Sequence, residues 1–151
     1  MNKLGTLLKN HELNKAIPYA RNLSPANLYD DIVEFIDSDN DNLIWYTVIL
    51  NLLLEKESPV LHNMLYNIFA FILNNFDGAP DVQLYHARRA LELSNEKDPL
   101  YPELLCNLLR LNYEPDEMVS DEEAKKIAQK VLEIDPNNDF VHDRIEEGLY
   151  K

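Results

Sequence analysis

The chain has 151 residues, 46% hydrophobic and 27% charged, a composition typical of a globular protein rather than a disordered one. Its formal net charge of −13 argues against nucleic acid as a ligand, because binding a phosphate backbone requires a basic surface. The single cysteine, Cys106, excludes an internal disulfide and favours a cytoplasmic protein.

Signals for the starts of helices recur along the chain. Ser24-Pro25 and Ser58-Pro59 each combine an N-cap residue with a proline at the first helical position, and Ser120 opens a capping box that includes Glu123. Between these signals the apolar residues recur at helical spacing, and no segment shows the alternation of a strand. The spacing predicts a helical region over about 3–22, disturbed at Pro18, and helices over about 25–37, 41–56, 59–76, 80–94, 100–112, 121–134 and 138–149.

The short loops between these segments predict antiparallel helical hairpins. We therefore expect one all-α domain over residues 1–151, with about seven to eight helices. The most apolar segment, residues 43–54, is too short to cross a bilayer. It is interpreted as a helix buried on nearly all sides, interrupted by Thr47 and Asn51. The first ten residues lack the apolar core of a signal peptide, so no membrane association is predicted.

The second half of the chain contains a repeated pattern of small residues. Ala124, Ala128, Leu132 and Pro136 resemble the second-helix signature of the tetratricopeptide repeat, and the segment from Ala87 to Pro99 resembles it more loosely. What the resemblance implies is a short stack of hairpins forming a tetratricopeptide-like, right-handed superhelix, most evident over residues 80–149.

A wider pattern is similar to a second family. It consists of Ile44-Trp45-Tyr46, His62, Asp77-Gly78-Ala79, the segment 84–91 and the segment 120–124. Together these resemble the small acidic, all-helical immunity proteins of bacterial polymorphic and contact-dependent toxin systems. The resemblance implies a protein that neutralises a cognate toxin by stoichiometric binding, with no catalysis and no cofactor.

The distribution of charge is the most informative physical feature of the sequence. From Asn22 to Ala87 the only basic residue is Lys56, against ten acidic residues. Such an excess opposes folding through self-repulsion, whereas a cationic partner gains rapid, steered association from it. The alternative is a solvated acidic surface that aids solubility. The predicted partner-binding residues are Asp30, Asp31, Glu34, Asp37, Asp39 and Asp41, together with Trp45 or Tyr46 if these are exposed.

No catalytic, metal or cofactor site is predicted. The run Asp37-Ser38-Asp39-Asn40-Asp41 resembles the start of a calcium loop, but Asn42 stands where glycine is needed and Val48 where a bidentate glutamate is needed. We interpret it as an acidic turn between helices. His62 and His86 lie on neighbouring predicted helices and are interpreted as core or boundary residues rather than a catalytic pair.

Three functions remain open. The first is an immunity protein whose toxin is basic, for example a nuclease domain. The second is a general tetratricopeptide-like adaptor or chaperone that binds a peptide through residues 80–149. The third, a small helical hydrolase or metal enzyme, lacks a converging cluster of titratable groups. The C-terminal segment around Ile145 and Leu149 has no further capping repeat, so an apolar edge there would support a homodimer.

Overall fold

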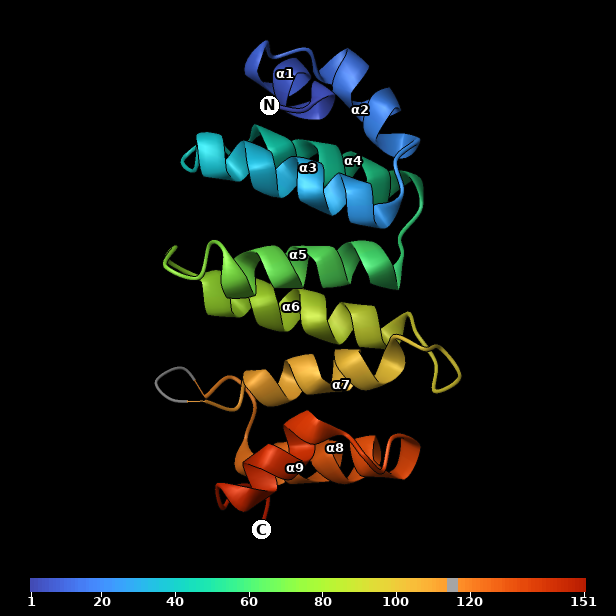
Figure 1. The fold of residues 1–151 in the computed structure, drawn as a ribbon, viewed down its shortest axis with the longest axis vertical. Coiled ribbons are helices and arrows are strands. Elements are labelled where there is room, and N and C mark those ends of the chain that lie inside the picture. Colours follow the sequence, from blue (N-terminus) through green and yellow to red (C-terminus); the bar gives the residue numbers. More distant parts are fainter. Residues whose placement is uncertain (114–116) are drawn as a thin grey trace. The chain divides into compact units, whose positions relative to one another are not determined.

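A computed structural model describes residues 1–113 and 117–151 of the chain (Figure 1). Within these residues the fold is all-α, as predicted, and no strand is formed. The described residues form nine helices rather than seven to eight. They are α1 (Lys3–Lys9), α2 (Leu13–Arg21), α3 (Pro25–Ser38), α4 (Ile44–Glu55), α5 (Pro59–Phe71), α6 (Ala79–Glu92), α7 (Tyr101–Arg110), α8 (Asp121–Ile134) and α9 (Asp139–Glu146).

The predicted number of helices is wrong because the segment 3–22 forms two helices. The break lies between α1 and α2 at His11, whose φ of 57° is in the left-handed region. A helix cannot continue through that conformation. Pro18, at which the disturbance was predicted, lies inside α2.

The predicted helix starts at the three serines are confirmed. The hydroxyls of Ser24, Ser58 and Ser120 each accept a hydrogen bond from the backbone N–H three residues later, at 3.2–3.3 Å. Each bond satisfies a donor that the first turn of a helix leaves open. At Ser120 the glutamate of the predicted box, Glu123, points elsewhere, because its carboxylate accepts two hydrogen bonds from Arg88 at 2.7 and 3.0 Å.

The chain divides into two compact units, Met1–Met64 and Leu65–Lys151, which we call the N-terminal and C-terminal units. In the N-terminal unit α1 packs against α2 and α3, and α2 packs against α4. Small buried residues, Ala16 and Ala20, allow α2 to approach its neighbours closely. Arg21 at the end of α2 forms an ion pair with Glu55 at the end of α4.

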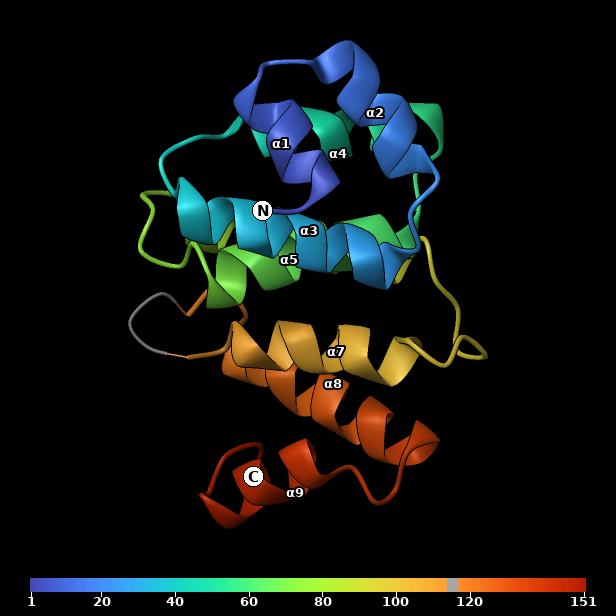
Figure 2. The ribbon, with the colours of Figure 1, turned by 45° about the horizontal axis from the view of Figure 1, so that its top comes forward.

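In the C-terminal unit α7 packs against both α6 and α8, and successive helices run in opposite directions (Figure 1). Figure 2 shows the same reversal of direction from α7 to α8 and from α8 to α9. The alanines of the repeated pattern, Ala87, Ala124 and Ala128, are buried in the core of this unit. The hydroxyl of Tyr66 donates to the backbone carbonyl of Asn107 at 3.3 Å, and burial raises the pKa of Tyr66 to about 12. No helix in the described part of the chain is both long and apolar enough to span a membrane.

Candidate functional site

The six predicted acidic residues belong to α3 and to the turn that follows it. We call them the acidic face: Asp30, Asp31, Glu34, Asp37, Asp39 and Asp41. The buried residues of α3 are Leu28, Ile32, Phe35 and Ile36. At about 100° per residue, Asp30, Glu34 and Asp37 lie on the opposite side of the helix from these, and all three are exposed. Asp41 is also exposed, whereas Asp31 and Asp39 are half-buried.

Two carboxylates of the acidic face have neighbours that fix their positions. The amino group of Met1 lies 3.1 Å from Glu34, and the side-chain amide of Asn2 donates to the same carboxylate at 3.0 Å. These hydrogen bonds lower the pKa of Glu34. In the turn, the Asn42 amide donates to Asp39 at 2.9 Å, and the Asn42 side-chain oxygen accepts from the backbone N–H of Ile44 at 3.1 Å. The turn and the first residues of the chain therefore position part of the acidic face.

Other charges on the acidic face repel one another. The pKa of Asp31 is raised by burial and then by the neighbouring charges of Glu34 and Asp30. The pKa of Tyr29 is raised by burial and by Asp30. No lysine or arginine occurs between Asn22 and Glu55, so the repulsion is offset only in part, by the amino group of Met1 beside Glu34. A basic partner would relieve it.

The same stretch does not gather ligands for a metal. Residues 39–43 form the turn between α3 and α4. Among residues 1–113 and 117–151, no group of three or more histidine, cysteine, aspartate or glutamate side chains is arranged to hold an ion.

The two aromatic residues predicted near the acidic face have different positions. Trp45 is completely buried, so it does not contribute to a partner-binding surface. Tyr46 is half-buried and contacts Trp45 edge-on, with ring centroids 5.6 Å apart. Of the pair, Tyr46 is therefore the one that reaches the surface.

The sequence did not predict a row of three exposed leucines. Two of them lie on α4 and the third is the residue immediately before this helix. Leu43, Leu50 and Leu54 are 48%, 38% and 87% exposed and lie opposite the buried side of the helix. The prediction that residues 43–54 are buried on nearly all sides is therefore wrong. Thr47 and Asn51, the two polar residues of the segment, border this row and were the signal for an exposed face. Leu43 lies two residues after Asp41, so the start of this row is close in sequence to the acidic face.

His62 and His86 each contact a side chain that is close to them in the sequence. His62 is 2% exposed and lies 3.0 Å from the carboxylate of Glu57, and His86 is 3% exposed and contacts the ring of Tyr85 edge-on. Their burial agrees with the prediction of core or boundary histidines.

Cys106 is a buried thiol in α7, and burial raises its pKa to about 11. Because the thiolate is the reactive form, we expect iodoacetamide to leave Cys106 unmodified at neutral pH in the native protein. In urea the thiol becomes accessible, its pKa returns towards about 8.5, and alkylation proceeds. Mass spectrometry after a timed exposure measures the difference, and rapid alkylation of the folded protein would contradict it.

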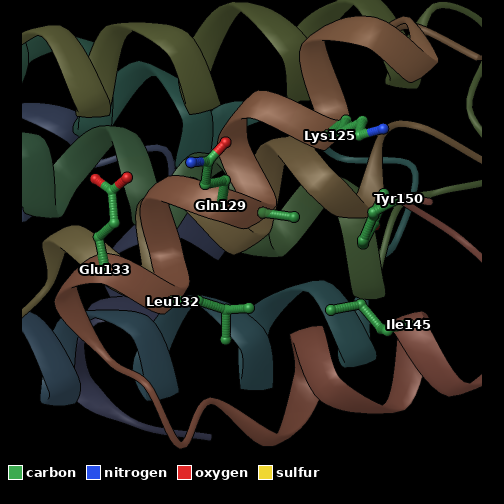
Figure 3. A pocket seen from close by; sticks show the side chains of 7 residues that line it. Lys125, Gln129, Leu132, Glu133, Ile145 and Tyr150 are labelled. Atoms are coloured by element: carbon green, nitrogen blue, oxygen red, sulfur yellow. The ribbon is translucent and has the colours of Figure 1, made fainter.

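The C-terminal unit carries a hollow of about 400 Å³ between α8, α9 and the last residues (Figure 3). We call it the C-terminal trough. Both apolar and polar side chains line it. It is lined by Lys125, Ala128, Gln129, Leu132, Glu133, Ile145 and Tyr150.

The chain matches no protein-family model, no curated protein and no solved structure. Its function is therefore inferred from the charge, exposure and contacts of the described residues. The acidic face is the strongest candidate, because it concentrates charge of one sign and is followed closely in the sequence by the exposed Leu43.

Proposed function

We propose that the protein is an immunity protein that binds a basic bacterial toxin one-to-one and blocks it without catalysis. The observation that carries this proposal is the acidic face, in which exposed carboxylates project from α3 over a stretch that contains no basic residue. Long-range attraction to such a surface raises the rate at which a cationic protein associates. A nuclease is a suitable toxin, because it must itself be basic to hold a nucleic acid.

The exposed leucines supply apolar contacts, which slow the dissociation of a complex in a way that charged residues alone do not. Charged rims set the association rate and orientation, whereas desolvated apolar contacts near the centre of an interface slow dissociation. Leu43, Leu50 and Leu54 form an exposed apolar row that begins two residues after Asp41 and continues along α4. The toxin surface that fits is therefore an apolar ridge flanked by lysines or arginines. Inhibition follows when this contact covers the active cleft or substrate-binding surface of the toxin.

The scaffold in this proposal is a tetratricopeptide-like stack of hairpins in a cytoplasmic protein. The buried alanines at 87, 124 and 128 and the opposite directions of successive helices in the C-terminal unit support the repeat. The alternative function, a peptide-binding adaptor, is favoured by the C-terminal trough, which is a hollow of suitable chemistry for a peptide side chain. An adaptor would bind its peptides independently of the acidic face.

The test is capture of the partner from the lysate of the source organism with the tagged full-length protein, at low and then high salt. We expect one basic protein in a one-to-one complex that salt weakens. Expressed alone, the captured protein should arrest growth, and co-expression of this chain should restore it. Recovery of several proteins that share a short peptide would support the adaptor instead. A captured protein that is harmless when expressed would contradict the immunity proposal.

A further inference from the structure

The trough-facing side of α8 carries an ordered series of polar residues. Lys125, Gln129 and Glu133 are spaced four residues apart, so they succeed one another about 6 Å apart along the helix axis. Figure 3 shows them along α8 with Lys125 at one end, Glu133 at the other and Gln129 between them. The cation and the anion are therefore equally far from Gln129 in sequence, on opposite sides of it.

Apolar side chains beside this series are incompletely covered. Leu132, Ile145 and Tyr150 are half-buried and pack against the core of the C-terminal unit from its edge. Tyr150 reaches the trough because Gly148, with a φ of 94°, turns the chain back after α9. The trough thus exposes an extension of the core, which a second apolar surface would cover favourably.

The middle of α8 is a basic segment of this acidic chain. Lys125, Lys126 and Lys130 occur there, and no acidic residue lies between Ala124 and Leu132. Two copies with a net charge of −13 each repel one another over most orientations. Within each copy, Lys126 lies 2.6 Å from Glu122, and Lys130 lies 2.7 Å from Glu96 and 3.8 Å from Glu133. Because these ion pairs offset the charge of two of the three lysines, contact through the middle of α8 adds little to the repulsion between copies.

These features favour a second copy of the chain as the occupant of the trough. An antiparallel pair of α8 helices related by a two-fold axis through Gln129 places residue 125 of each copy opposite residue 133 of the other. Isologous interfaces require such self-complementarity, in which the same patch on both subunits supplies both members of every pair. A peptide ligand would need only one side of this arrangement and no symmetry about Gln129.

We infer that the C-terminal trough is a homodimer interface in which α8 packs antiparallel on α8 of a second copy. Lys125 pairs with Glu133 of the second copy at both ends, the two Gln129 amides meet at the axis, and Leu132 and Ile145 are covered. The inference goes beyond the proposed function, because it concerns the C-terminal unit, whereas the acidic face lies in the N-terminal unit. A monomeric chain that still neutralises a toxin would refute the dimer alone.

The test is a charge exchange in the full-length protein, followed by sedimentation equilibrium over a wide range of concentrations. In a homodimer of the Lys125→Glu variant, two acidic side chains face each other at each end of the helix pair. In a homodimer of the Glu133→Lys variant, two basic side chains face each other at each end. We expect either variant to raise the dimer Kd by at least about tenfold. Lys97→Glu, which makes the same change in net charge as Lys125→Glu at an exposed residue outside α8, should leave the Kd close to that of the unmodified protein.

Mixing the two variants supplies the decisive measurement. In the mixture, the glutamate introduced at position 125 of one chain faces the lysine introduced at position 133 of the other, and the unmodified ends form the original pair. The K125E and E133K chains should therefore form a heterodimer although neither pairs well with itself. The double variant K125E/E133K should regain the homodimer for the same reason. A monomer at every concentration, an unchanged Kd in K125E, or no heterodimer in the mixture would overturn the inference.

Discussion

Replacing Trp45 with alanine is expected to lower the free energy of unfolding by about 3–5 kcal/mol. Trp45 is completely buried, and among residues 1–113 and 117–151 it is the largest of the fully buried side chains. Its removal forfeits the transfer free energy of the indole and leaves a cavity that the surrounding helices fill only in part. The edge contact with Tyr46 is lost as well, which adds to the effect.

Urea unfolding followed by circular dichroism measures this change. The matched control is Leu54→Ala, a truncation on the same helix of a side chain that is 87% exposed. We expect the control to change the free energy of unfolding by less than about 0.5 kcal/mol. A loss below about 1 kcal/mol in Trp45→Ala would mean that this side chain is not in the core, and would reopen its assignment to the partner-binding surface.

Helix boundaries are predictable where a local interaction determines them. The serine caps at 24, 58 and 120 bond to N–H groups three residues away, so the sequence contains all the atoms involved. The break between α1 and α2 has a weaker signal, because the left-handed residue is His11 rather than a glycine, although Asn10 precedes it as the C-cap of α1. Pro18 was the stronger sequence signal, yet it lies inside α2.

The candidate site was predictable in its charge but not in its apolar part. The sequence alone shows six acidic residues among residues 30–41, in a stretch that contains no lysine or arginine. The segment 43–54 is apolar at almost every position, so periodicity does not tell which side is buried. Trp45 faces inward and Leu54 outward because of how α4 packs, which is a tertiary property. The trough likewise depends on the turn at Gly148, which returns Tyr150 to α8.

The association of the protein with its basic partner is expected to slow by about 10- to 1,000-fold at low salt when Asp30, Asp31, Glu34 and Asp37 are all replaced by lysine. Attraction that steers the toxin towards α3 is then converted into repulsion. The dissociation rate should change less, because the exposed leucines are retained. Stopped-flow measurement of the association rate against ionic strength tests this, and the difference between the two proteins should narrow as salt shortens the Debye length to about 8 Å at 0.15 M.

The matched control reverses four exposed acids of the C-terminal unit, Asp77, Asp81, Asp143 and Glu146, and so changes the net charge by the same amount. If the acidic face steers the toxin, the control should slow association much less than the reversal on α3. Equal slowing by both sets would mean that net charge acts without a defined surface, and an unchanged rate in the α3 variant would contradict binding through this face. Circular dichroism of each variant establishes that the helices remain folded, because Asp31 is half-buried and Glu34 is held by Asn2. The comparison therefore separates a binding surface from an acidic coat that serves only solubility.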